Sequence, residues 1–160
     1  MLPDVLRSGL RVVFCGTAAG TKSAATGAYY AGPGNQFWPV LHRIGLTPAQ
    51  LAPAEYERLL DYGVGLTDVC KTRSGSDLEV GEDGFDVDGL LDRLRRAGPA
   101  HVAFNGKKAG QVVVGRKVSY GVQPEQLARA RVHVLPSTSG AARGFWDEKH
   151  WVDLAAALAR

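Results

Sequence analysis

The sequence predicts an α/β fold, a three-layer α/β/α sandwich with a central, mostly parallel sheet. Short apolar, β-branched segments alternate with segments of helical periodicity along the 160 residues, a pattern typical of a parallel sheet covered on both faces. The length suits one domain, which usually has about 100 to 200 residues. Hydrophobic residues make up 45% of the chain, so we expect one well-packed domain over residues 1–160.

The first half of the chain supplies two strands and one clear helix. Residues 11–16 (RVVFCG) form a buried strand that ends at a glycine, and residues 17–34 form a loop rich in small residues. Apolar residues recur at helical spacing from Phe37 to Ile44, where Gly45 ends the helix. Short helical pieces over 47–60 lead to a second strand over 64–70. The tryptophans and phenylalanine of the helical segments belong to the core by their spacing: Phe37, Trp38, Trp146 and Trp151.

The second half continues the alternation. A polar loop over 71–84 leads to Asp86, an N-cap for a helix over 87–97 that Gly98 and Pro99 end. A strand over 101–105, a helix over 106–114, a strand over 131–135, a loop over 136–140 and a closing helix over 145–159 follow. Ligands bind at the carboxyl ends of the strands in such sheets. We therefore expect the loops after Gly16, Val69 and Leu135 to share one rim.

Several protein classes are disfavoured by composition. No apolar stretch approaches the roughly 20 residues of a transmembrane helix, and residues 1–14 lack the pattern of a secretory signal. Cys15 and Cys70 are too few for a disulfide framework or a four-cysteine metal site. We expect a cytoplasmic, monomeric protein without membrane contact, metal or other cofactor.

Charge is segregated along the chain although the net charge is only +3. Residues 52–92 hold eleven acids against three bases, and residues 93–143 hold ten bases against one acid, Glu125. This asymmetry suggests a surface that faces a polyanion. The alternative is that these charges only solvate opposite helices.

The first loop, GTAAGTKS over 16–23, supplies two glycines that permit close backbone approach to a ligand. It does not match the phosphate loop G-x-x-x-x-G-K-[ST], because only three residues separate its glycines, and it does not match G-x-G-x-x-G. Spacing alone favours a structural turn over a ligand-binding loop.

The following residues, SAATGAYYAGPGNQFW over 23–38, make the pattern specific. The stretch from Leu10 to Thr47 resembles the mismatch-specific uracil-DNA glycosylase family, which includes the thymine-DNA glycosylases. LDYGVGLT over 60–67, FNGK over 104–107 and LPSTSGAAR over 135–143 extend the similarity over nearly the whole chain. The resemblance implies a uracil-DNA glycosylase-like domain that binds double-stranded DNA containing uracil or a mismatch, excises uracil by hydrolysis, especially opposite guanine, and leaves an abasic site for base excision repair.

The resemblance also implies a base-binding pocket. Glycosylases flip the target nucleotide out of the duplex and stack its base on an aromatic side chain, a role that falls to Tyr30, although an ordinary core tyrosine is the alternative. The backbone of Thr17 and Gly20, with Ser23 nearby, would contact the uracil edge and stabilise charge on the leaving base. Many family members carry a water-holding Asn in the first loop where this chain has Ala18. Asn35 is a candidate for positioning polar groups, or a helix cap.

Asp68, near the end of the second strand, is our candidate for the missing catalytic function. A carboxylate can stabilise an oxocarbenium-like state and orient water. The alternative is an exposed strand-end carboxylate or a partner for Lys71.

Contacts with DNA are expected from the second family loop and from a helix start. By resemblance the loop over 137–143 enters DNA and reads the opposite guanine, but small residues stand where a bulky wedge is expected; its candidates are Ser137, Ser139, Gly140, Ala141, Ala142 and Arg143. Lys107 and Lys108 could bind phosphate, or could simply be solvated. Leu135 stands where related branches have a catalytic His, and His133 is expected to be structural.

Three other functions remain open on the sequence. Ala18 could mark a non-catalytic lesion or mismatch binder. The pocket could serve another deaminated base such as hypoxanthine or xanthine, because pocket shape and not fold selects the base. The glycine-rich loop alone would also suit a small-nucleotide or phosphate-binding protein.

Overall fold

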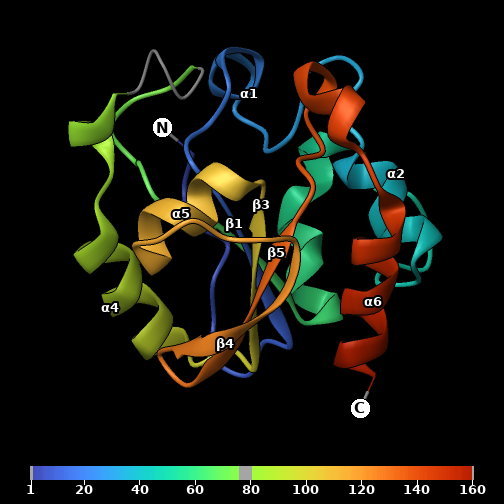
Figure 1. The fold of residues 1–160 in the computed structure, drawn as a ribbon. Coiled ribbons are helices and arrows are strands. Elements are labelled where there is room, and N and C mark those ends of the chain that lie inside the picture. Colours follow the sequence, from blue (N-terminus) through green and yellow to red (C-terminus); the bar gives the residue numbers. More distant parts are fainter. Residues whose placement is uncertain (1, 76–80, 160) are drawn as a thin grey trace.

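The computed structural model describes residues 2–75 and 81–159 and is built around a five-stranded sheet (Figure 1). The strands lie in the order β2-β1-β3-β5-β4, and all neighbours are parallel except β4 and β5. Their bounds are β1 Val12–Gly16, β2 Val64–Asp68, β3 His101–Asn105, β4 Gly121–Leu127 and β5 Ala130–Leu135. The predicted α/β class with a mostly parallel sheet is confirmed.

Side chains alternate between two hydrophobic cores, one on each face of the sheet. Val12 and Phe14 of β1 belong to one core, whereas Val13 and Cys15 belong to the other. This period of two is the geometry of a strand buried on both faces. It explains why β1 is apolar throughout.

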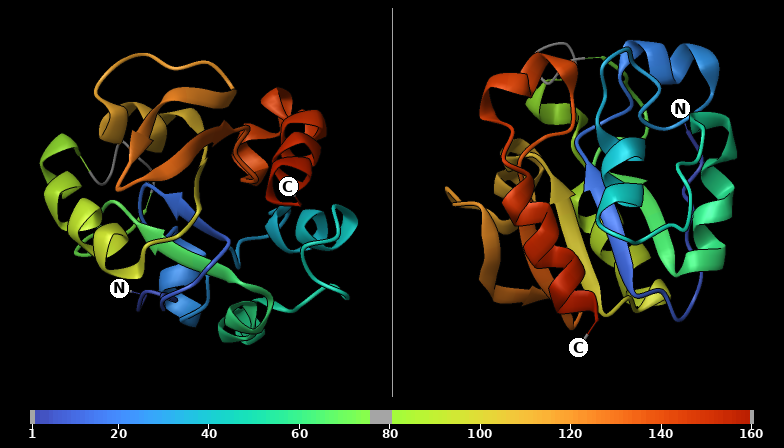
Figure 2. Two further views of the ribbon diagram at one scale, coloured as in Figure 1. Left: turned by 90° about the horizontal axis from the view of Figure 1, so that it is seen from below. Right: turned by 90° about the vertical axis from the view of Figure 1, so that its right-hand side faces the viewer.

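Helices cover both faces and complete the three layers (Figure 2). One face is covered by α2 (Phe37–Arg43), the 3-10 helix η1 (Pro53–Tyr62) and α6 (Glu148–Leu158), and the other by α4 (Val87–Ala97) and α5 (Lys107–Val114). Asp86 Oδ1 accepts from Gly89 N–H (3.0 Å), and Gly98 ends α4 with φ +60°. The predicted cap and stop of this helix are therefore confirmed. Three short helices complete the described part of the fold: α1 (Thr21–Thr26), η2 (Glu82–Gly84) and η3 (Gly140–Phe145).

Three elements differ from the sequence prediction. The loop over 17–34 contains α1, whose small residues give no apolar helical pattern. The closing helix does not begin at Phe145, because Trp146 is extended and Asp147 caps α6 by accepting from Lys149 N–H (3.1 Å). The edge strand β4 was missed because its sequence, GVQPEQL, is polar and contains Pro124. Proline is compatible with an edge strand, and the register shifts between Val122 and Gln126.

The segment before β1 also joins the sheet. Val5 exchanges two backbone hydrogen bonds of 2.9 Å with Leu66 of β2, in antiparallel orientation. A Cβ atom on Gly65 would lie only 2.7 Å from Val5 O. Glycine at this position therefore permits the segment Leu2–Val5 to approach β2.

Within residues 2–75 and 81–159, no helix has the length and apolar character needed to cross a membrane.

Candidate active site

A cavity of about 720 Å³ opens at the carboxyl ends of the strands. After β1 the chain leaves toward α1 and α2, whereas after β3 it leaves toward α5 on the other face (Figure 1). Such a divergence between neighbouring strands creates a crevice, the usual place for a ligand in an open α/β sheet. Gly16, Asp68, Asn105 and Ser137 all line this cavity. The expected shared rim of the loops after β1, β2 and β5 is thus observed.

Backbone hydrogen bonds tie the first loop to the loop after β2. Gly16 O accepts from Val69 N–H (3.0 Å), Thr17 O accepts from Cys70 N–H (2.7 Å), and Ala19 O accepts from Gly75 N–H (2.9 Å). The loop residues that line the cavity include Thr17, Ala18, Gly20 and Ser23. These bonds fix the path of the first loop around the base of the cavity.

Tyr30 lines the cavity in a conformation that the surrounding loop imposes. Its φ of +52° lies in the left-handed region, which is uncommon for a residue other than glycine. Ser23 Oγ accepts from Ala31 N–H (3.0 Å), and Trp38 Nε1 donates to Tyr29 O (3.0 Å). The two bonds hold the backbone on both sides of Tyr30.

The Tyr30 hydroxyl is buried and has no hydrogen-bond partner among the described residues. It lies near Gly16, where a Cβ atom would be 3.5 Å from Tyr30 Oη and 3.2 Å from Asp68 Oδ1. Burial, followed by the charge of Asp68, raises the pKa of Tyr30 far above its usual value of 10.0. Tyr30 is therefore neutral, and Gly16 leaves room for both oxygen atoms.

Asp68 stands at the end of β2 and lines the same cavity. The residue is only 3% exposed, so the predicted alternative of an exposed carboxylate is wrong. Its Oδ2 lies 3.2 Å from Lys71 Nζ, so the alternative of a partner for Lys71 agrees with the geometry. Burial raises the pKa of Asp68 above its usual value of 3.8, and Lys71 opposes this shift. Among the described residues that line the cavity, Asp68 is the one carboxylate.

Three further residues line the cavity: Ala18, Asn35 and Asn105. Asn35 Oδ1 accepts from Phe37 N–H (3.0 Å), so Asn35 supports the start of α2 as the capping alternative suggested. Asn105, which the sequence analysis did not single out, donates from Nδ2 to Thr138 Oγ1 (2.9 Å) and accepts from Thr138 N–H at Oδ1 (2.9 Å). It thereby fastens the loop after β5 to the end of β3.

The loop after β5 packs against the segment before α2. Gln36 N–H donates to Thr138 O (2.8 Å), and a Cβ atom on Gly140 would lie 3.2 Å from Pro33 O. Arg143 lies against Gly34, close enough that a Cβ atom there would be 2.8 Å from its guanidinium. Among the predicted DNA-binding residues, Ser137, Ser139, Gly140, Ala141 and Ala142 line the cavity. Arg143 is exposed beside it.

Hydroxyl groups and a tryptophan fix this loop from within. Ser137 Oγ accepts from Ser139 N–H (3.2 Å), and Ser139 Oγ accepts from Ala141 N–H (3.2 Å), which caps η3. Trp151 Nε1 donates to Pro136 O (3.0 Å). Phe37, Trp38 and Trp151 are buried, as predicted, and Trp146 is partly buried.

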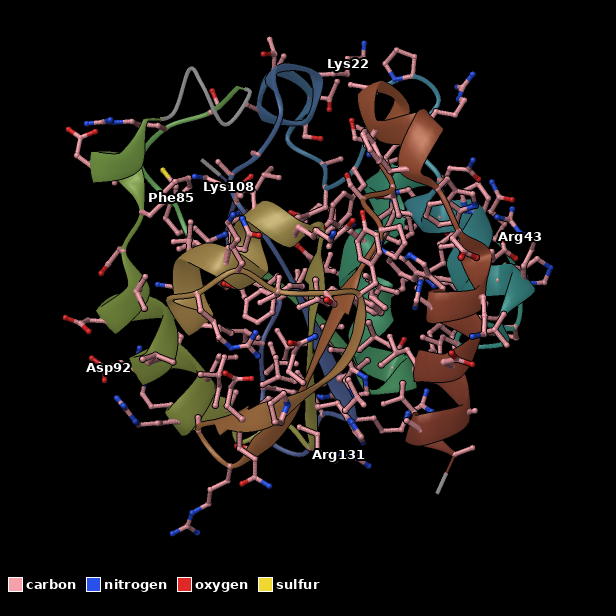
Figure 3. The ribbon with its side chains drawn as sticks, viewed as in Figure 1. Lys22, Arg43, Phe85, Asp92, Lys108 and Arg131 are labelled. Carbon is pink, nitrogen blue, oxygen red and sulfur yellow. The ribbon has the colours of Figure 1, made fainter. Side chains whose placement is uncertain are left out.

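The cavity mouth carries two aromatic residues that the sequence analysis did not assign to it. Tyr120 lines the mouth, and Lys107 Nζ lies 4.5 Å from its ring centroid. Phe145, at the end of η3, also lines it and is 72% exposed, the largest exposure among the bulky apolar side chains that the structure describes. Lys108 lines the cavity and lies 5.7 Å from the Phe85 ring (Figure 3). Helical spacing had suggested only that Phe145 begins a helix.

The basic residues of segment 93–143 do not form one surface. Lys108 lies near the end of the molecule that holds the cavity, whereas Arg131 lies at the opposite end (Figure 3). Arg95 and Arg116 form ion pairs with Asp92 and Glu125. The basic residues are therefore divided between the cavity end and the opposite end, and a polyanion-facing surface stays a prediction. Asp77 and Glu79 of the acidic segment lie outside the described residues.

His133 belongs to the sheet, as the sequence analysis expected. Its Nε2 lies 3.0 Å from His101 Nδ1, and both rings are buried. Neither His101 nor His133 belongs to the described lining of the cavity. No group of three His, Cys, Asp or Glu side chains within residues 2–75 and 81–159 could hold a metal ion.

Comparison with known proteins identifies the family. Residues 3–158 match the Uracil DNA glycosylase superfamily. The chain belongs to this superfamily. It also resembles the solution NMR structure of a protein from Methanosarcina acetivorans that is proposed to be a uracil DNA glycosylase, with 26% identity, a TM-score of 0.66, and coverage of 99% of this chain and 97% of that one.

Membership in the uracil-DNA glycosylase superfamily gives the cavity a chemical context. It supports a uracil-DNA glycosylase-like function, the hydrolysis of a bond between a base and deoxyribose in DNA. The cavity accordingly needs an aromatic surface for a base and a group that acts at the sugar. Tyr30 and Asp68 are residues of these two kinds and line one cavity.

Proposed function

We propose that the protein is a monofunctional DNA glycosylase that removes uracil from duplex DNA, especially from G·U mismatches, and leaves an abasic site. One observation carries the proposal: Asp68, the one carboxylate among the described lining residues, shares the cavity with Tyr30. The resemblance of the first loop and of the loop over 135–143 to the mismatch-specific branch supports uracil as the base. The activity belongs to base excision repair.

In this proposal the flipped uracil stacks on Tyr30 and its polar edge meets the first loop. The Tyr30 ring is already supported from behind by Phe37, with ring centroids 4.0 Å apart. Backbone N–H groups of Thr17 and Gly20 would donate to the uracil oxygens and stabilise the negative charge that develops on the leaving base. The side chain of Ser23 acts indirectly, because its Oγ holds the backbone next to Tyr30.

Asp68 acts on the sugar side. As the N-glycosidic bond breaks, positive charge develops on the deoxyribose, and a buried carboxylate stabilises it strongly. The same carboxylate orients a water molecule that attacks C1′, and the water proton passes to Asp68 or to the departing base. Asp68 thereby replaces the amide that Ala18 lacks.

The rim would hold the duplex. Phe145 is the bulky apolar side chain at the cavity mouth, and its exposure of 72% suits insertion into the base stack in place of the expected wedge. Arg143, which lies against Gly34, and Lys108, which lines the cavity, suit contacts with phosphate. Backbone groups of the loop over 137–143 would read the guanine opposite uracil.

The test is single-turnover base release from duplexes with one uracil opposite guanine or adenine, scored as abasic sites by alkaline cleavage. Asp68→Asn should slow release by about 10² to 10⁴-fold, the usual contribution of a general acid or base, while duplex affinity stays within about threefold. Asp153→Asn, an exposed carboxylate of α6, is the matched control.

Two outcomes would contradict the proposal in different ways. Full activity of Asp68→Asn would remove Asp68 from the mechanism. No release by the unaltered protein, despite tight duplex binding that weakens with salt, would favour a non-catalytic lesion binder. Repeating the assay with hypoxanthine and xanthine duplexes would then test the other deaminated bases.

A further inference from the structure

Behind Asp68 lies a partly buried ionic network that the proposed mechanism does not yet use. Lys71 Nζ lies within 3.2 Å of four oxygen atoms, which belong to Asp4 (2.8 Å), Tyr29 (2.8 Å), Leu2 O (3.1 Å) and Asp68 (3.2 Å). The Lys71 side chain is only 22% exposed. A lysine held from four directions is fixed in position, unlike a flexible surface lysine.

The segment Leu2–Val5 is what holds this lysine. It is anchored by its two backbone bonds to Leu66 and by Tyr29 Oη, which donates to Pro3 O (3.0 Å). Asp4 is in turn fixed by Arg93 Nε (2.8 Å) and by Thr67 Oγ1, which donates to Asp4 Oδ1 (2.8 Å). The two carboxylates and two cations of this partly buried cluster balance in charge, which offsets the cost of removing them from water.

The two oxygens of Asp68 have different surroundings. Oδ2 faces Lys71, whereas Oδ1 lies beside Gly16 and near the Tyr30 hydroxyl, both of which line the cavity. Arg93 donates to the backbone oxygen of Asp68 (2.8 Å) and fixes the main chain. Lys71 therefore holds the carboxylate by Oδ2, and Oδ1 faces the residues that line the cavity.

We propose that Lys71, held by the segment Leu2–Asp4 and by Tyr29, is a positioning residue that keeps Asp68 charged and directs its Oδ1 into the cavity. This inference rests on the proposed function, in which Asp68 is the catalytic carboxylate. The groups around Asp68 act in opposite directions. Burial raises the pKa of Asp68, Lys71 and Arg93 lower it, and Asp4 raises it. The other ionisable neighbours among the described residues are Cys15, Tyr29 and Tyr30. The pKa of each is raised by burial and by Asp68, so they stay neutral.

The test is a pair of measurements from pH 5 to 9 on the full chain. The first follows the Asp68 carboxyl by carbon-13 NMR and gives its titration midpoint, and the second is single-turnover base release. Lys71→Met should raise the midpoint by about one unit or more. Release should then be about tenfold slower at pH values below both midpoints, with the deficit shrinking toward pH 9. Lys71→Arg should restore much of the behaviour of the unaltered protein. Lys117→Met, an exposed lysine outside the cavity, is the matched control.

Asp4→Asn supplies a change of opposite sign. Asparagine keeps an oxygen for Lys71 but removes a negative charge near Asp68, so the midpoint should fall. This variant retains the Lys71 contacts to Tyr29 and Leu2 O and carries the test if Lys71→Met does not fold. A midpoint that neither variant moves, or a loss of activity that is equal at every pH, would overturn the positioning role.

The two readouts separate this inference from the proposed function. If the midpoint shifts as expected while Asp68→Asn retains full base release, the positioning role stands and the proposed mechanism fails. If the midpoint does not move while Asp68→Asn abolishes release, the mechanism stands and Lys71 is only structural.

Discussion

The ring of Tyr30 stacks on the ring of Phe37, with centroids 4.0 Å apart and 29° between the planes. Phe37 is fully buried and packs edge-on against Phe14 at 5.3 Å. Tyr30 is thus the outermost ring of an aromatic stack that begins in the core beneath the sheet. A platform supported in this way is rigid before any base arrives, which lowers the entropic cost of binding.

Two substitutions of Tyr30 should therefore separate the contribution of its ring from that of its hydroxyl. Tyr30→Leu should weaken the flipped state by about 1–3 kcal/mol, the usual value of one base stacked on an aromatic side chain, and slow single-turnover release accordingly. Tyr30→Phe keeps the ring and removes a buried hydroxyl without a partner among the described residues, so folding stability should be unchanged or higher by about 1 kcal/mol. Equal activity of both variants would show that Tyr30 only fills the core.

The pH dependence of base release should report Asp68. Because burial raises the pKa of Asp68, the carboxylate is lost as pH falls through a value above the usual 3.8. We expect an acidic limb in the single-turnover rate whose midpoint lies above 3.8 and which Asp68→Asn abolishes. The same limb in Asp68→Asn would assign the titration to another group.

The missing amide at position 18 can be restored. Ala18 and Asp68 line one cavity, so an asparagine at position 18 could hold water there when the carboxylate is absent. Adding Ala18→Asn to the Asp68→Asn variant should raise its rate of base release at least about tenfold. This gain is part of the usual contribution of general acid–base catalysis. Ala156→Asn, at an exposed position of α6 outside the cavity lining, is the control. No recovery would mean that the two positions do not serve the same water.

Phe145 should matter for duplex DNA and not for a single strand. Its side chain is 72% exposed at the end of η3, so Phe145→Ala should leave the stability of the fold within about 0.5 kcal/mol. Release from a duplex should fall because the vacated position in the stack is no longer filled, whereas release from single-stranded DNA should persist. A fluorescent base analogue opposite or beside the uracil would follow flipping directly. Equal losses on both substrates would contradict insertion.

Most helices and strands could be predicted because each buried segment carries its own local sequence pattern. The run from Val12 to Gly16 is apolar on both faces, and Asp86 and Gly98 mark the ends of α4. The strand β4 could not be predicted, because an edge strand is stabilised by its neighbour and needs little apolar pattern of its own. The Val5 bridge to Leu66 depends on Gly65, 60 residues later, and leaves no local signal.

The candidate site was predictable in membership but not in geometry. Position at the end of a strand selected Asp68, whereas the resemblance of the two loops selected Thr17 and Ser137; all three line the cavity. The sequence suggested Lys71 only as an alternative partner of Asp68, since the oxygens that hold it come from residues 2, 4 and 29 as well. Phe145 was missed because exposure, which makes it a candidate, depends on how η3 packs.

The histidine pair away from the cavity should make folding stability fall in mild acid. Burial, then the neighbouring His101, lowers the pKa of His133 from 6.5 to about 4. Below pH 6.5 the unfolded chain takes up a proton that the folded chain refuses until about pH 4, so stability is lost across this window and is unaffected above it. The linked loss is roughly 3 kcal/mol at full extent. Denaturant unfolding of His133→Gln, which keeps polar groups but does not titrate, should show a smaller loss between pH 6.5 and pH 4. Parallel curves for the two proteins would show that His133 is protonated equally in both states.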